Sequence, residues 1–132
     1  MSSRIVLDAS ALLALLNSEE GSETVSKMLP GSALSAVNLC EVVGKLTEAG
    51  MPEEPIRAAL ASLGLEIHAF DEENAYAAGL LRKRTKMFGL SLGDRACIAL
   101  ALHLSVDVLT ADHDWKKLKL PVKVQTIRRS RC

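Results

Sequence analysis

The feature that most constrains the fold of this chain is the alternation of short strand-like segments with helical ones. Segments of apolar or alternating character, which are typical of strands, occur at residues 4–7, 33–35, 66–70, 106–110 and 122–127. Helix signals fill the intervals between them. This order predicts an α/β domain with a mainly parallel sheet that is covered by helices on both faces.

The helices of this pattern are placed by capping residues at their starts and by glycine or proline near their ends. They are expected at residues 11–16, 22–29, 36–49, 52–64, 72–85 and 92–103, with a short helical segment at 112–117. The expected caps are Ser10, Ser35, Asp71 and Ser91. No repeat or linker interrupts the pattern, so residues 1–132 are predicted to form a single domain.

Composition narrows the class of protein further. Apolar residues make up 48% of the chain and aromatic residues 3%, which excludes disorder and predicts an aliphatic core. The three cysteines, Cys40, Cys97 and Cys132, are odd in number and widely spaced, which argues against a disulfide framework and favours a reducing compartment. Cys40 and Cys97 are interpreted as small buried core residues.

Charge and hydropathy bear on partners and location. The 16 basic and 16 acidic residues cancel, so any nucleic acid would have to be bound by a local patch. Arg82, Arg84 and Lys86 belong to the densest basic run before the C-terminal tail and are a candidate RNA-binding patch; interaction with a helix dipole is the alternative. No apolar stretch approaches the roughly 20 residues of a membrane span, and a cytoplasmic location is expected.

Four carboxylates fall at positions where chemistry is expected. Asp8 directly follows the first predicted strand, and Asp112 follows the fourth, so both belong at the carboxyl edge of the sheet, where α/β folds bind ligands. Glu41 interrupts an apolar helical stretch, and Asp94 lies in the first turn of a helix. Each also has a purely structural interpretation: Asp8 and Asp112 as helix caps, Asp94 in a capping box, and Glu41 in an ion pair with Lys45.

The four carboxylates together predict a metal site. Two carboxylates about 5 Å apart at an effective dielectric near 20 repel each other by about 3 kcal/mol. In a cluster of four, either the pKa values of the carboxyl groups rise steeply or a cation neutralises their charge. An all-oxygen site favours a hard divalent ion, Mg²⁺ or Mn²⁺. Such an ion at a sheet edge indicates metal-assisted phosphoryl chemistry.

Four segments carry a resemblance to a known family. They read IVLDASA at residues 5–11, SAVNLCEV at 35–42, GLSLGDRA at 89–96 and LTAD at 109–112. In this order they resemble PIN-domain ribonucleases, and among these the VapC-type toxins of type II toxin–antitoxin pairs. The resemblance extends over about residues 4–128.

This resemblance implies a PIN-like three-layer α/β/α sandwich with a five-stranded sheet. It implies that Asp8, Glu41, Asp94 and Asp112 form the acidic site of a Mg²⁺-dependent endoribonuclease. It also implies a homodimer and a cognate antitoxin that inhibits the toxin, often with a basic side chain in the acidic pocket. The small and apolar residues of 11–16 and 52–63 are expected to form a groove for an amphipathic partner helix.

In the mechanism that we expect, Asp8, Asp94 and Asp112 hold the metal and Glu41 holds or orients the attacking water. Four further residues are candidate auxiliaries, each with a structural alternative. Ser10 and Thr110 either contact metal-bound water or phosphate, or serve helix capping and strand packing. Asp114 is either an outer ligand of the metal or a solvated helix residue. Arg95 either binds the substrate phosphate or is a surface residue without a role.

Two other functions fit parts of the sequence. A PIN nuclease of RNA processing would use the same site without an antitoxin. A receiver-like signalling module would share the parallel sheet and a Mg²⁺-binding acidic pocket, with Asp71 after the third strand as its phosphoacceptor. That interpretation leaves Glu41 and Asp94 without a role.

Overall fold

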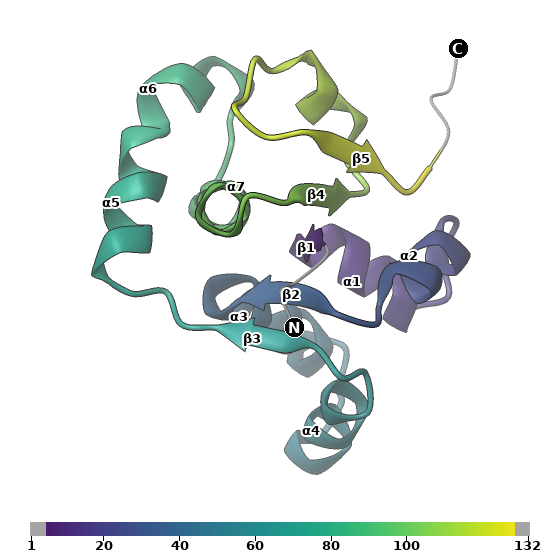
Figure 1. Ribbon diagram of the computed structural model, residues 1–132. Helices are drawn as coiled ribbons and strands as arrows, with labels where there is room; N and C mark the ends of the chain where they lie inside the picture. Colours follow the sequence, from purple (N-terminus) through teal and green to yellow (C-terminus); the bar gives the residue numbers. More distant parts are fainter. Residues whose placement is uncertain (1–4, 129–132) are drawn as a thin grey trace.

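A five-stranded parallel sheet forms the centre of the computed structural model, which describes residues 5–128 (Figure 1). The strands are β1 (Ile5–Leu7), β2 (Ser32–Ser35), β3 (Glu66–His68), β4 (Asp107–Thr110) and β5 (Val124–Thr126). Their order is β3-β2-β1-β4-β5, and every neighbouring pair is parallel. The prediction of an α/β fold with a mainly parallel five-stranded sheet is confirmed.

The central strand β1 is buried on both faces, as its uninterrupted apolar sequence predicts. Val6 lies level with Ala33 of β2 and Val108 of β4. Because side chains alternate along a strand, Ile5 and Leu7 enter one core cluster while Val6 enters the other.

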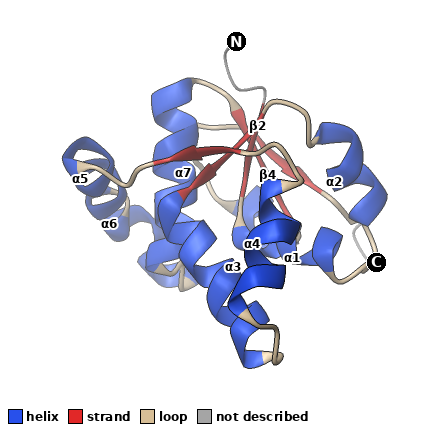
Figure 2. Ribbon diagram, turned by 90° about the horizontal axis from the view of Figure 1, so that it is seen from below, coloured by secondary structure: helices blue, strands red, loops and turns tan. Residues whose placement is uncertain are grey.

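The first layer of helices consists of α1 (Ala9–Leu16), α2 (Ser22–Met28), α3 (Ala36–Glu48) and α4 (Glu53–Ala61). Leu12, Val25 and Val42 from three of these helices pack on Ile5 and Leu7. Helices α3 and α4 lie side by side, apart from α5 and α6 (Figure 2). This layer therefore fixes the position of α3, the helix that carries Glu41.

The second layer is built on α7 (Leu92–Leu104), with α5 (Glu72–Leu80) and α6 (Arg82–Thr85) outside it (Figure 1). Cys97, Ile98 and Ala101 of α7 pack against Val6 and Val108. Two 3₁₀ helices complete the described part of the chain, η1 (Lys86–Phe88) and η2 (His113–Lys117). Residues 96–101 of α7 are buried on all sides between the sheet and the helices α3 and α5, and this sets the position of Asp94 in the first turn of α7.

Three local expectations are wrong. The helix expected over 72–85 is two helices, because α5 ends at Leu80 and a new helical segment begins at Arg82. Helix α1 is capped by Asp8, whose side chain accepts from the Ala11 amide, and not by Ser10. Cys40 is exposed on α3, whereas Cys97 is buried as expected; Cys132 lies outside the described residues.

Among residues 5–128, no helix is long and apolar enough to cross a membrane.

Candidate active site

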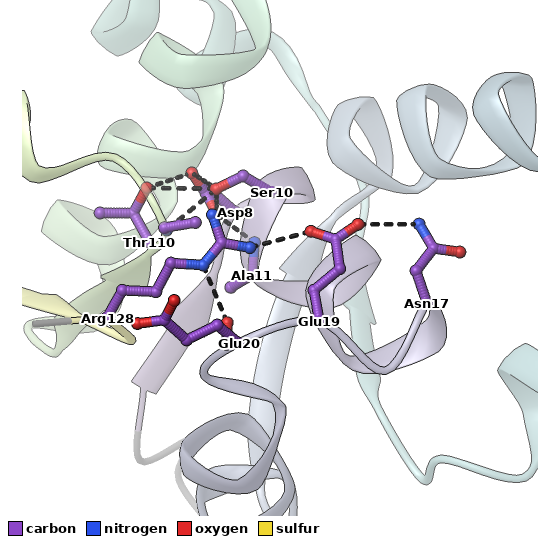
Figure 3. Close-up of polar contacts among 9 residues, drawn as sticks. Asp8, Ser10, Ala11, Asn17, Glu19, Glu20, Thr110 and Arg128 are labelled. Atoms are coloured by element: carbon purple, nitrogen blue, oxygen red, sulfur yellow. Dashed lines mark hydrogen bonds and ion pairs between the residues drawn. The ribbon is translucent and has the colours of Figure 1, made fainter.

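Asp8 lies where β1 ends and is only 4% exposed. Its backbone amide continues the ladder by donating to the Leu109 carbonyl at 3.1 Å. Oδ1 accepts from the Ala11 amide at 2.8 Å, and Oδ2 accepts from the Thr110 hydroxyl at 2.5 Å. The Ser10 hydroxyl lies 2.8 and 2.9 Å from the two oxygens (Figure 3). The carboxylate is therefore held by donors from β4 and from the first turn of α1.

The two hydroxyls at Asp8 are oriented by the turn that follows β4. The Ala111 amide donates to Ser10 Oγ at 3.0 Å, and the Asp112 amide donates to Thr110 Oγ1 at 3.1 Å. Because each hydroxyl already accepts a backbone hydrogen bond, its own proton is free to point at the carboxylate. Ser10 and Thr110 thus link Asp8 to the turn that carries Asp112.

Glu41 projects from α3 toward the start of α7. Its Oε1 accepts from the Asn38 side-chain amide at 2.9 Å. A Cβ placed on Gly93 would lie 2.5 Å from Cδ of Glu41, so this carboxylate rests directly on the Gly93 backbone. Glu41 is exposed, so the expected cost of burying it does not arise. Within the described chain the carboxylate paired with Lys45 is that of Glu48, at 4.0 Å, and not that of Glu41.

Asp94 is half-buried in the first turn of α7 and closes a capping box with Ser91. The Ser91 amide donates to Asp94 Oδ2 at 2.9 Å, and the Asp94 amide donates to Ser91 Oγ at 3.2 Å. The prediction that Asp94 belongs to a capping box is therefore confirmed. The capping box uses Oδ2 of the carboxylate, and Oδ1 remains for another ligand.

Three of the four carboxylates act on the same buried thiol. Burial raises the pKa of Cys97, and the negative charges of Asp8, Asp94 and Glu41 raise it further. Burial also raises the pKa of Asp8 to about 6, against the lowering effect of the hydrogen bonds from Thr110, Ala11 and Ser10; the charge of Asp94 adds to the rise. Carboxylates that follow β1, lie on α3 and begin α7 are thus all close enough to raise the pKa of one thiol of α7, although they are far apart in the sequence.

Asp112 and Asp114 occupy the turn into η2. Asp112 is exposed, and its Oδ1 accepts from the Asp114 amide at 2.9 Å, so it caps this short helix. Asp114 is also exposed and lies 3.2 Å from the Lys117 ammonium. Asp112 is connected to Asp8 through Thr110, whereas the observed partner of the Asp114 carboxylate is a lysine one turn along.

The donor chemistry of this site fits a hard cation, although its side chains are not gathered around one. Within residues 5–128, no three His, Cys, Asp or Glu side chains lie close enough together to hold a metal ion as placed. The hydrogen bonds occupy one oxygen each of Glu41, Asp94 and Asp112. A second oxygen on each of these three carboxylates remains for a ligand, and the buried charge of Asp8 would be relieved by a cation.

The predicted basic residues lie on the α5–α6–α7 side. Arg95 Nη1 donates to the Ala78 carbonyl of α5 at 3.0 Å, so this guanidinium braces α5 against α7. Arg82, Arg84 and Lys86 are exposed on α6 and η1. They form an accessible basic surface, while Arg95 is engaged with backbone.

A cavity of about 1130 Å³ opens between the α1–α2 loop, η2 and the end of β5. Its lining includes Ala111, Lys116 and Arg128. Arg128 donates through Nε to the Glu20 carbonyl and through Nη2 to Glu19 Oε1, both at 2.8 Å (Figure 3). Lys116 and Arg128 were not among the predicted basic residues, because only the fold brings η2 and a residue after the end of β5 to one cavity.

A second groove, of about 840 Å³, lies between α3, α4 and β3. Leu39, Val43, Ile56, Leu60 and Ile67 provide most of its apolar lining. The expectation of an apolar groove at α4 is met. The expected contribution of residues 11–16 is not, because α1 is packed into the first core cluster.

Comparison with known proteins identifies the family. The family model of the PIN domain matches residues 5–120. The chain belongs to the PIN domain family. No match was found among curated proteins by sequence comparison.

This PIN domain is similar in fold to solved structures along nearly its whole length. A toxin–antitoxin complex from Klebsiella pneumoniae matches with a TM-score of 0.75 and 22% identity, over 96% of this chain and 99% of that one. A DNA-bound VapBC from Salmonella typhimurium gives a TM-score of 0.72 and 17% identity over 95% and 98%. FitAcB from Neisseria gonorrhoeae matches with a TM-score of 0.66 and 23% identity, over 93% of this chain and 97% of that one. At these identities the likeness concerns the fold.

Proposed function

We propose that this PIN domain is a metal-dependent endoribonuclease and the toxin of a toxin–antitoxin pair. The observation that carries the proposal is the buried Asp8 carboxylate, held at the carboxyl edge of the sheet by Ser10 and Thr110, with the charges of Glu41 and Asp94 acting on the same Cys97 thiol. A buried acid with a raised pKa beside further carboxylates is typical of a catalytic site.

Each acidic residue has a distinct part in this proposal. Asp8, Asp94 and Asp112 would hold Mg²⁺ or Mn²⁺, and Glu41 would join them or accept a proton from the attacking water. The ion supplies a water of lowered pKa and stabilises charge on the phosphate. Ser10 and Thr110 orient the Asp8 carboxylate and favour its ionised form, because both donate to it and so offset part of the rise in its pKa that burial causes.

RNA would reach this site over basic surface. Arg82, Arg84 and Lys86 are exposed on the α6 side, and Lys116 lines the cavity beside the β4–η2 turn. These residues would bind phosphates, and Asp114 and Arg95 would act through the elements that they brace. Local basic surface is required because the chain has no net charge.

The toxin assignment is supported by the fold. The neighbouring structures include VapBC and FitAcB and a toxin–antitoxin complex, all similar to this chain along nearly their full length. We propose a cognate antitoxin whose amphipathic helix occupies the groove between α3 and α4, and a homodimer as the active form. A PIN nuclease of RNA processing would lack that antitoxin.

The sheet order argues against the receiver-like alternative. Receiver sheets have the order 2-1-3-4-5, which places the third strand beside the first. Here β2 separates β3 from β1. Asp71 therefore follows an edge strand, and its side chain caps α5 through the Asn74 amide at 2.9 Å.

The proposed function is tested by incubating the purified protein with total RNA in Mg²⁺ and in EDTA and mapping the cut ends. We expect the RNA to be cut in the presence of Mg²⁺ and not in EDTA. The products should carry 5′-phosphate and 3′-hydroxyl ends. Co-expression with the product of a neighbouring short reading frame should suppress cleavage if the protein is a toxin. Cleavage that is equal in EDTA would contradict a metal-dependent mechanism.

A further inference from the structure

The environment of Glu41 contains a buried asparagine that the roles above do not use. Asn38 lies on α3, one turn before Glu41, and is only 1% exposed. Its Nδ2 donates to Glu41 Oε1 at 2.9 Å and to the Gly93 carbonyl of α7 at 3.1 Å. Both partners are acceptors, so the orientation of this amide is fixed by its contacts.

The carbonyl end of the Asn38 side chain differs from its amino end. Its Oδ1 is buried and has no hydrogen-bond partner in the described part of the chain. A buried acceptor without a partner is destabilising, and such groups in folded proteins often mark functional positions. The two hydrogen bonds that Asn38 donates, to Glu41 and to the Gly93 carbonyl, give a reason for an asparagine at this buried position.

Gly93 completes the environment of Glu41 from the opposite helix. A Cβ at this position would lie 2.5 and 2.6 Å from Cδ and Oε2 of Glu41, and closer still to Oε1. Gly93 has no positive φ, so its backbone does not require glycine. The requirement comes from the carboxylate, which occupies the space where a side chain would lie.

We propose that Asn38 and Gly93 are positioning residues that hold the Glu41 carboxylate against the first turn of α7, beside Asp94. Asn38 holds the carboxylate from α3 and joins α3 to α7, and Gly93 provides the space. This inference rests on the proposed function, because it gives Glu41 its orientation for the attacking water or the metal.

The first test separates activity from stability at Gly93. In Gly93→Ala the new methyl group displaces the carboxylate of Glu41, which is the end of a flexible side chain, and alanine favours helix more than glycine does, so Tm should be kept or raised. Because the carboxylate is moved, kcat should fall between about tenfold and a hundredfold with little change in KM. Gly44→Ala is the matched control, because Gly44 lies in α3 and a Cβ at that position would have nothing within 4 Å. It should keep wild-type kcat.

The second test removes the amide. Asn38→Ala should lower kcat by a similar factor, and neither Asn38→Ala nor Gly93→Ala should lower it further in a Glu41→Gln background. Asn74→Ala is the control, since Asn74 is also nearly buried and its amide donates to Asp71 three residues earlier at 3.0 Å. Asn74→Ala should lower Tm but leave kcat within about twofold.

A readout without RNA keeps this inference separable from the proposed function. Mn²⁺ should raise the Tm of the wild type and of both control variants more than that of Gly93→Ala and Asn38→Ala. If the wild type binds Mn²⁺ but cleaves no RNA, the proposed function fails and the Mn²⁺ response alone decides the positioning role. Wild-type kcat and Mn²⁺ response in Gly93→Ala would overturn the inference, as would an Asn74→Ala variant as impaired as Asn38→Ala.

Discussion

Asp8 is buried and accepts hydrogen bonds from Ala11, Ser10 and Thr110, whereas Glu41 is exposed and accepts one from Asn38. The first carboxylate follows a strand whose register with β4 places its partners. The second lies on a helix and depends on the contact between α3 and α7. The site therefore has one half that the sheet register places, called the rigid half below, and one half that the packing of α3 on α7 places, called the adjustable half.

The largest effect is expected at the rigid half. Asp8→Asn removes the charge while keeping the size of the side chain, and cleavage should fall at least about 10³-fold. Circular dichroism and Tm should show a folded protein, because the Asn side-chain carbonyl can still accept from the Ala11 amide. Cleavage within tenfold of the wild type would show that the buried carboxylate is not part of the chemistry.

Stability should depend on pH through the same residue. The pKa of Asp8 is raised from 3.8 to about 6, so the folded state binds this proton more tightly than the unfolded state. The stabilisation from that proton is complete below pH 3.8 and is lost as the pH rises through about 6, a change of about 3 kcal/mol.

Urea unfolding of the metal-free protein between pH 4 and 7 measures this dependence. Asp8→Asn should lack this component, so the difference in unfolding free energy between variant and wild type should change across this range. A constant difference would mean that Asp8 titrates alike in the folded and unfolded states.

A smaller effect is expected when one donor of the rigid half is removed. Thr110→Val keeps the shape of the side chain but removes the hydroxyl that donates to Asp8, so the pKa of Asp8 should rise further and kcat should fall about tenfold. Thr85→Val is a matched control, because Thr85 is also buried and its hydroxyl donates to the Leu81 carbonyl, one turn earlier. Equal activity of both variants would show that the hydroxyl only supports packing.

The smallest effect is expected outside both halves. Replacing Arg82, Arg84 and Lys86 together by alanine should raise KM several-fold and reduce the slope of log KM against log salt by about 2, with kcat unchanged. A Lys27→Ala/Lys45→Ala variant serves as the control for loss of positive charge. An unchanged salt slope would place the RNA on another surface, with the cavity that Lys116 lines as the next candidate.

The sequence predicted the rigid half better than the adjustable one. Uninterrupted apolar runs identify buried parallel strands, and a residue after such a strand has its place at the sheet edge whatever the helices do. Asp8 follows this rule, and Thr110, the last residue of β4, lies at the same edge. The break at Leu81 was not predicted, because the residues around it favour helix and tertiary packing decides where α5 ends.

The adjustable half depends on contacts that no local pattern encodes. Asn38 and Gly93 are 55 residues apart, and only the packing of α3 on α7 makes them partners. Glu41 was singled out for an apolar neighbourhood in sequence, yet it is exposed in the structure. The sequence could have singled out Asn38 as a polar residue among apolar ones, one helical turn before Glu41. It could not have shown that Asn38 contacts Gly93.

The central claim, that carboxylates distant in sequence act as one site, is tested most directly by the cleavage rate of purified Asp94→Asn in Mg²⁺. Asparagine at this position can still accept from the Ser91 amide and keep the helix cap, so the fold should survive. We expect wild-type Tm with cleavage lost. A folded Asp94→Asn protein that cleaves RNA at the wild-type rate would contradict the claim.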